Sequence, residues 1–214
     1  MNVYLLEEDG GGVCMFDAGS ADMAGALASA GRGLGGITRI VLGHAHPDHR
    51  GAAPALAVPT FCHPADKADA EGDGGDHYFD FSELSFPFNH TLRVLLDRWD
   101  GGPVNITGTV EEGDEVAAGF KVVHLPGHAP GLIALYRERD GVALTTDCFY
   151  TLDPRTSRKG AARVPHAAFT LDTEGARGSI RKLAGLGPSA AWPGHADPLT
   201  SDVAAQLERA AARG

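Results

Sequence analysis

A run of six residues holds three imidazoles and a carboxylate. It reads His44-Ala45-His46-Pro47-Asp48-His49. Zinc and other borderline divalent cations prefer histidine and carboxylate ligands. A folded chain has little structural reason to crowd imidazoles, because each buried ring needs a hydrogen-bond partner. The run therefore predicts a metal site.

Three later motifs place another histidine or aspartate directly after a predicted strand. They are Pro126-Gly127-His128, Thr146-Asp147 and Pro193-Gly194-His195. Strand ends in one sheet system converge on one edge, so these side chains can share a cleft with the first run. The seven candidate ligands are His44, His46, Asp48, His49, His128, Asp147 and His195. Seven exceed the four ligands of one tetrahedral zinc and suit two metals roughly 3.5–4 Å apart that share a carboxylate and a water.

Hydrophobic patterning predicts alternating strand-rich and mixed regions. The apolar, β-branched run at 38–43 is typical of a buried strand, and Pro47 argues against a helix continuing through the histidine cluster. Strands are predicted at 2–8, 13–17, 59–62, 106–110, 115–116, 120–125, 132–137, 142–146 and 190–192. Helices are predicted from a Ser20 N-cap to about 30, at 51–57, at 173–184 and from about 202, with a long loop at 147–170. Two packed sheets with helices outside fit this order.

Residues 66–104 differ in character from their surroundings. Aspartate and glycine dominate 69–76, and an aromatic, partly helical stretch follows. This segment is a candidate cap over a pocket. The alternative is a helix that packs on the core.

Bulk composition limits the class of protein. The length of 214 residues favours a single domain. The net charge of −10 disfavours a nucleic-acid partner, because an acidic surface repels the phosphate backbone. No apolar run approaches the roughly 20 residues of a membrane span, and the acidic N-terminus does not resemble a signal peptide. Three widely spaced cysteines argue against a disulfide framework and fit a reducing cytoplasm.

The ordered motifs HAHPDH, PGHAPG, TDCFY and PGHAD resemble the metallo-β-lactamase superfamily, and their style is similar to that of glyoxalase II-like hydrolases. The resemblance covers nearly the whole chain and begins with NVYLLEEDGGGVCMFDAGS, which is similar to that family's opening hairpin. It implies a single α+β domain over 1–214, an αββα sandwich of two mixed β-sheets flanked by helices, with the 66–104 segment as an insert.

The resemblance also implies how the ligands divide. The first metal would take His44, His46 and His128, the second would take Asp48, His49 and His195, and Asp147 would bridge them. Asp17 would orient a ligand or its loop. The bridging carboxylate argues against an antibiotic-destroying β-lactamase. The chain departs from the glyoxalase II pattern at two places. In Arg50-Gly51-Ala52 the second of two common glycines is replaced by Ala52, and Thr146 stands where glycine is common before the bridging aspartate.

The implied activity is hydrolysis of an ester, thioester, lactone or amide bond in a small molecule by a metal-bridging hydroxide. Asp48 would orient the nucleophile and help protonate the leaving group, and Tyr150 would donate to the carbonyl. Two divalent ions are expected, zinc first, with iron or manganese as alternatives. The protein is expected to be a monomer or homodimer. The rival hypotheses are a mononuclear iron persulfide dioxygenase on the same fold, a nuclease, and a metal-binding protein without catalysis.

Overall fold

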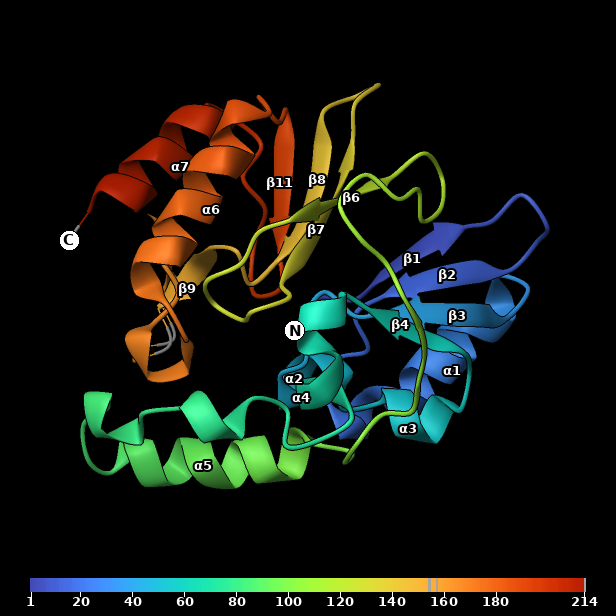
Figure 1. Cartoon of the computed structure of the whole chain (residues 1–214), viewed down its shortest axis with the longest axis horizontal. Coiled ribbons are helices and arrows are strands. Elements are labelled where there is room, and N and C mark those ends of the chain that lie inside the picture. The colour runs from blue at the N-terminus through green and yellow to red at the C-terminus, as the bar shows by residue number, and fades with distance from the viewer. Residues whose placement is uncertain (154, 157, 214) are drawn as a thin grey trace.

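Two mixed β-sheets form the centre of the molecule (Figure 1). The computed structural model describes residues 1–153, 155–156 and 158–213. The first sheet has the strand order β1-β2-β3-β4-β5, in which β1 and β2 form a hairpin and the remaining neighbours are parallel. Its strands are β1 (Tyr4–Glu7), β2 (Val13–Phe16), β3 (Ile37–Val41), β4 (Thr60–Cys62) and β5 (Ile106–Thr109).

The second sheet has the order β11-β8-β7-β6, with β11 parallel to β8 and the other pairs antiparallel. Its strands are β6 (Lys121–His124), β7 (Ile133–Arg137), β8 (Val142–Thr146) and β11 (Ala190–Pro193). A separate two-stranded ribbon joins β9 (Tyr150–Asp153) to β10 (Arg158–Arg163).

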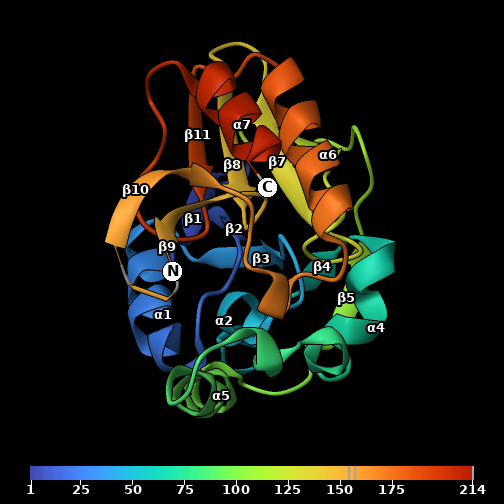
Figure 2. The same ribbon diagram turned by 90° about the vertical axis from the view of Figure 1, so that its left-hand side faces the viewer.

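Helices cover the outer face of each sheet (Figures 1 and 2). Helices α6 (Thr173–Gly185) and α7 (Val203–Ala212) pack on the second sheet, where Ile180 and Leu207 join its buried side chains. Helix α1 (Ala24–Gly33) packs on the first sheet through Leu27. Between the sheets, Phe16 and Ile133 belong to one buried apolar cluster. These four layers confirm the predicted αββα sandwich.

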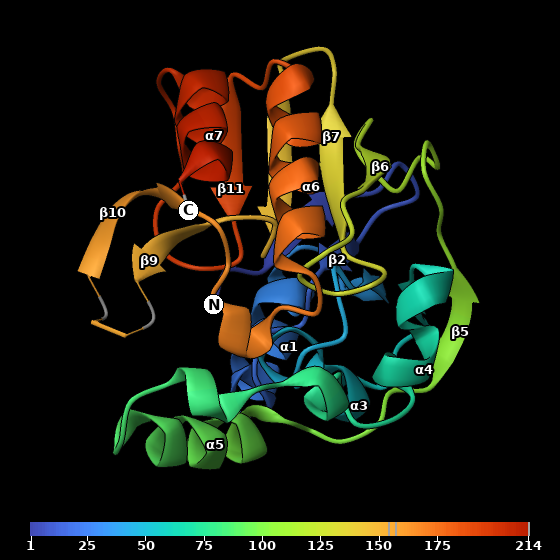
Figure 3. The ribbon, with the colours of Figure 1, turned by 60° about the vertical axis from the view of Figure 1, so that its left-hand side comes forward.

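The remaining α-helices lie in or just after the ligand run or belong to the 66–104 segment. They are α2 (Pro47–Arg50), α3 (Ala53–Leu56), α4 (Lys67–Ala70) and α5 (Phe88–Trp99), with 3-10 turns at 21–23, 64–66, 76–78, 81–83 and 167–169. Helix α5 lies at the end of the molecule opposite the β7–β8 turn (Figures 1 and 3).

Buried Arg50 ties both ends of this segment to the ligand loop. Its guanidinium donates hydrogen bonds to the carbonyls of Asp69, Ala70 and Gly72 and to both carboxylate oxygens of Asp100. The side chain is 1% exposed, so every donor that it buries needs such a partner. Arg50 therefore fixes the 66–104 segment relative to the ligand run.

Three local predictions were wrong. Ser20 makes no capping hydrogen bond, because its hydroxyl bonds to Asp22 instead, and the α-helix starts at Ala24. The predicted loop at 147–170 contains β9 and β10. The predicted strand at 115–116 is only an isolated bridge between Glu115 and Lys121.

In the described part of the chain, no helix combines the length and the apolarity that a membrane crossing demands.

Candidate metal centre

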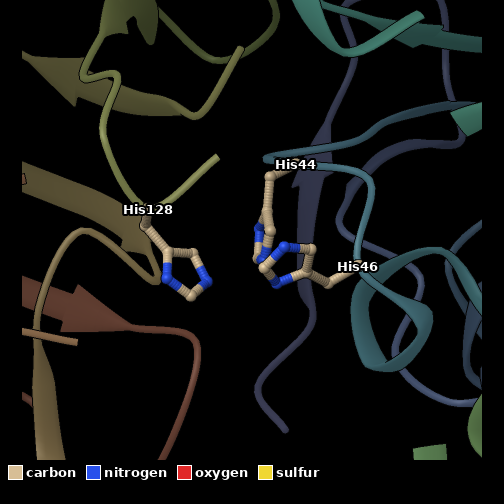
Figure 4. A group of neighbouring side chains, drawn as sticks. All are labelled: His44, His46 and His128. Carbon is tan, nitrogen blue, oxygen red and sulfur yellow. The ribbon is translucent and has the colours of Figure 1, made fainter. Parts of the chain in front are cut away.

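All seven predicted ligands lie at one edge of the sandwich. Five are on loops that follow strands, whereas Asp48 and His49 belong to the short helix α2, which begins at Pro47. The loop after β3 carries His44 and His46, and the loop after β6 carries His128. In Figure 4 these three side chains point toward one another from the two sheets. They form one cluster able to hold a metal ion, and Asp48, His49 and His195 form a second.

Two histidines of the first cluster have one nitrogen fixed by a hydroxyl. The Thr170 hydroxyl donates to the His166 carbonyl (2.9 Å), so it accepts from Nδ1 of His128 (3.1 Å). In His44, Nδ1 lies 3.1 Å from the Thr146 hydroxyl. Each ring therefore keeps Nε2 for the interior of the cluster.

In His46 it is Nε2, and not Nδ1, that contacts a hydroxyl. Its Nε2 lies 2.7 Å from the hydroxyl of Tyr78, which belongs to the 66–104 segment. If Nε2–H donates to that hydroxyl, Nδ1 carries the free lone pair. Sequence reasoning missed Tyr78, because nothing in its local sequence marks this long-range contact.

Asp17 orients His49 of the second cluster. One carboxylate oxygen accepts from Nδ1 of His49 (2.9 Å), and the other accepts from the Gly43 backbone N–H (2.6 Å). Asp17 thus orients both a candidate ligand and its loop, as the resemblance implied. Nε2 of His49 then faces Nε2 of His195 at 3.4 Å.

Asp147 lies between the two clusters. Its Oδ1 is 3.3 Å from Nε2 of His49, and its Oδ2 is 3.3 Å from Nε2 of His195 and 3.7 Å from Nε2 of His128. One carboxylate therefore faces nitrogens of both clusters, which is the placement that a bridging ligand needs.

Buried polar atoms without partners mark the middle of this arrangement. Among the described residues, Nε2 of His44, Nε2 of His128 and Oδ1 of Asp147 are buried and make no hydrogen bond. Such atoms are rare in native proteins and call for an explanation. Imidazole nitrogens and carboxylate oxygens are the donor set of a divalent cation, so these residues fit a bound metal.

The histidine pKa values are lowered in the first cluster and raised in the second. Burial lowers the pKa of His128 to about 4, and burial together with neighbouring imidazoles holds the pKa of His44 and His46 well below the usual range. These rings are neutral at pH 7 and keep the lone pair that a cation binds.

In the second cluster, carboxylates reverse the effect of burial. Burial opposes protonation of His195, but Asp147 and Asp48 outweigh it and raise its pKa to about 9. Burial is likewise outweighed at His49, where Asp147, Asp17 and Asp48 raise the pKa. Without a metal these rings hold protons, and a cation would displace them.

Three residues beside the ligands, among them Ala196 with φ 63°, adopt a left-handed backbone. Asp17 has φ 61° and Thr146 has φ 40°, a region that favours glycine. At Thr146 the strained conformation is accompanied by contacts from its hydroxyl to Nδ1 of both His44 and His49. This explains how a threonine is used where the family pattern commonly has glycine.

Asp66 joins the two loops of the first cluster and was also missed from sequence. Its buried carboxylate accepts from the backbone N–H of Ala45 (3.0 Å) and from that of Gly131. Burial raises the pKa of Asp66 to about 7, although both backbone hydrogen bonds oppose this.

A cavity of about 230 Å³ opens beside the clusters. His46, Asp48, Asp147, His195 and Tyr150 line one part of it, and Phe79 and several α5 side chains line another. The ring of Tyr150 is buried, with its centroid 5.7 Å from that of His195. Cys148 instead lies in the apolar core under α6.

Comparison with known proteins agrees with this geometry. Residues 2–195 match the sequence profile of the Metallo-beta-lactamase superfamily. The probable metallo-hydrolase YflN of Bacillus subtilis (strain 168) is 28% identical over 219 residues, which cover 93% of this chain and 81% of YflN.

Two solved structures are similar along nearly the whole chain. The metallo-beta-lactamase family protein TTHA1429 from Thermus thermophilus is 28% identical with a TM-score of 0.67, covering 97% of this chain and 72% of that one. TTHA1623, solved in a di-iron-bound form, is 26% identical with a TM-score of 0.67, covering 96% of this chain and 92% of that one.

Proposed function

This chain belongs to the metallo-β-lactamase superfamily, and from that premise we propose that it is a dinuclear metal-dependent hydrolase. Its substrate is a small molecule with an ester, thioester, lactone or amide carbonyl. The similarity to YflN, a probable metallo-hydrolase, supports the reaction class. The di-iron form of TTHA1623 supports a pair of ions.

The position of Asp147 is the observation that carries the proposal. Its two oxygens face nitrogens of both clusters, and one of these, Nε2 of His128, is buried without a hydrogen-bond partner. We assign one ion to His44, His46 and His128 and the other to Asp48, His49 and His195, with Asp147 between them. Zinc is the first candidate, and iron and manganese accept the same ligands.

Two divalent ions bound here would supply Lewis acidity and lower the pKa of a bound water to roughly 7. The residues around the ions then position the reactants. In the metal-free protein burial opposes ionisation of Asp48, but protonated His49 and His195 outweigh it and hold the pKa of Asp48 well below its usual range. A bound cation that displaced those protons would favour the ionised carboxylate in their place. The Asp48 carboxylate therefore accepts a hydrogen bond from the attacking water and directs it at the carbonyl.

Tyr150 supplies a donor on the cavity side. Burial, Asp147 and Asp48 raise the pKa of its phenol well above the usual value, so the hydroxyl keeps its proton at neutral pH. We assign it to the substrate carbonyl oxygen, where it would stabilise the charge that develops on attack.

The test is removal and return of the metal. Protein stripped with a chelator should lose activity on a panel of aryl esters, thioesters and lactones, and stoichiometric zinc, iron or manganese should restore it. Full activity after complete removal, measured on the same samples by elemental analysis, contradicts the proposal.

The same samples test the rival dioxygenase. Its mononuclear iron site would need only one cluster, whereas both clusters are complete in this chain. One equivalent of iron together with oxygen uptake on a glutathione persulfide would support the dioxygenase and overturn the hydrolase.

A further inference from the structure

The walls of the cavity are chemically uniform outside the proposed ligands. The 66–104 segment contributes apolar side chains only, and Leu152 and Phe169 continue the apolar surface on the other side. Tyr150 adds one hydroxyl. A substrate bound here meets apolar surface everywhere except at the reacting carbonyl.

No lysine or arginine is among the described residues that line the cavity. One arginine on each of two neighbouring elements already has a partner. Arg93 of α5 stacks over Phe81 and lies 3.7 Å from the Asp76 carboxylate, and Arg163 of β10 lies 2.9 Å from Asp153. Along the walls away from the proposed ligands, a carboxylate or phosphate on the substrate would be desolvated without a cationic partner, which is costly.

Helix α5 presents one apolar stripe to the cavity. Phe88, Leu92, Leu95, Leu96 and Trp99 recur at the spacing of a single helix face, and all five line the cavity. None of them is fully buried. Leu92 and Leu96 also touch the small cluster around Phe169, whereas Leu95 does not belong to that cluster. The stripe therefore forms part of the cavity wall, and only some of its side chains also pack against the apolar cluster.

From the cavity we propose a substrate class: a neutral carbonyl compound whose acyl group is a medium-length alkyl chain or an aromatic ring, selected by the α5 stripe. This rests on the proposed function and narrows it. A cavity of about 230 Å³ is slightly smaller than the usual pocket for drug-sized ligands, which agrees with a small acyl group. It disfavours glutathione thioesters, whose carboxylates would find no cation along these walls.

A series of p-nitrophenyl esters tests the class with metal-loaded protein. From acetate to butyrate to hexanoate, kcat/KM should rise about fourfold per added methylene until the cavity is full. The p-nitrophenyl monoester of adipic acid has the same chain length as the hexanoate and a terminal carboxylate. It should react about a hundredfold more slowly than the hexanoate, because its charge is buried unpaired.

Variants on α5 show whether the stripe sets the preference. Leu95→Arg should lower kcat/KM for the hexanoate and raise it for the adipate monoester. Val94→Arg is the matched control, because Val94 neighbours Leu95 on the helix, is 53% exposed and does not line the cavity. Val94→Arg should leave both values within about twofold of wild type, as expected for an exposed surface position. Equal effects of the two variants would overturn the role of the stripe.

Binding to metal-free protein separates this inference from the hydrolase proposal. In a Trp192→Phe background, Trp99 in the cavity wall should report saturable binding of 1-hexanol by fluorescence, and 1-butanol, shorter by two methylenes, should bind at least about tenfold more weakly. Hexanol binding without turnover of any ester would contradict the proposed hydrolase activity but would still support the preference of the cavity for apolar groups. Turnover without chain-length preference, or with faster cleavage of the adipate monoester, would sink the substrate class and leave the hydrolase standing.

Discussion

Each histidine of the site is set by a hydrogen bond on the nitrogen away from the cluster or by a neighbouring carboxylate. Thr170 holds His128, Thr146 holds His44, and Asp17 holds His49. Because a neutral imidazole has one donor and one acceptor nitrogen, fixing the first selects the second as ligand. The sequence predicted the rings and the orienting role of Asp17, but neither of the two threonines as a partner.

Tyr78 is the partner of His46 that comes from the 66–104 segment. Tyr78→Phe keeps the ring and removes the hydroxyl 2.7 Å from Nε2, so His46 loses its orienting contact. We expect binding of one zinc ion to weaken about tenfold, measured by competition with a chromophoric chelator. Tyr136→Phe removes a hydroxyl that bonds to the Leu186 carbonyl, far from the site, and should leave zinc affinity unchanged. Equal loss in both variants would argue against a specific role of Tyr78.

The proposed role of Tyr150 as a hydrogen-bond donor predicts an effect on kcat. Tyr150→Phe should lower kcat by at least about tenfold, because a single donor to a developing oxyanion contributes strongly, while metal content stays at the wild-type value. Steady-state kinetics and elemental analysis on one preparation check this. An unchanged kcat would remove Tyr150 from the mechanism.

Asp66 makes stability depend on pH. Its pKa is about 7 in the folded protein against a usual 3.8, so the folded state keeps a proton that the unfolded chain releases. Its contribution to stability is fully present below pH 3.8 and is lost as the pH rises through about 7. Relative to Asp66→Asn, metal-free wild type should lose at most roughly 1.4 kcal/mol of unfolding free energy per pH unit within this window. Denaturant unfolding at several pH values measures the difference, and a flat or rising difference would contradict it.

At the scale of elements, the site depends on loops that leave parallel or antiparallel strands at one edge. The sequence predicted these loops well, because β3, β8 and β11 are short, largely apolar strands that end within a few residues of the motif residues. It did not predict the β9–β10 ribbon. The sequence of β10 is RKGAAR, whose mostly exposed side chains show no alternation of apolar and polar positions. β10 pairs with β9, which comes just before it in the chain, but no local pattern of apolar positions marks this pairing.

Gly194 tests how closely the β11 loop approaches the site. A Cβ at this position would lie 2.3 Å from Oδ1 of Asp147 and 2.6 Å from Cε1 of His49. Gly194→Ala should therefore displace both side chains and reduce bound metal by at least one equivalent. Gly178→Ala, in α6 with open space around it, should bind metal as wild type does and be slightly more stable. Full metal content in Gly194→Ala would show that the loop tolerates the intrusion.

At the scale of the whole molecule, hydrophobic pattern and motif order were enough to predict the sandwich and the edge that carries the site. Contacts between distant segments were not accessible in the same way. Asp66 joins two ligand loops, and Arg50 joins the ligand run to both ends of the 66–104 segment. Each is a charged residue whose partners are mainly backbone groups, and backbone partners leave no sequence signature. The apolar cavity wall likewise exists only once α5 is placed over the site.

Metal stoichiometry tests the central claim most directly. Protein expressed without metal supplementation, then stripped and reloaded, should hold two divalent ions per chain by elemental mass spectrometry. His128→Ala and Asp48→Ala should each hold fewer, because each removes a ligand from a different cluster. Stoichiometry of one or none in the reloaded wild type, or unchanged content in both variants, would contradict a dinuclear site built from these seven residues.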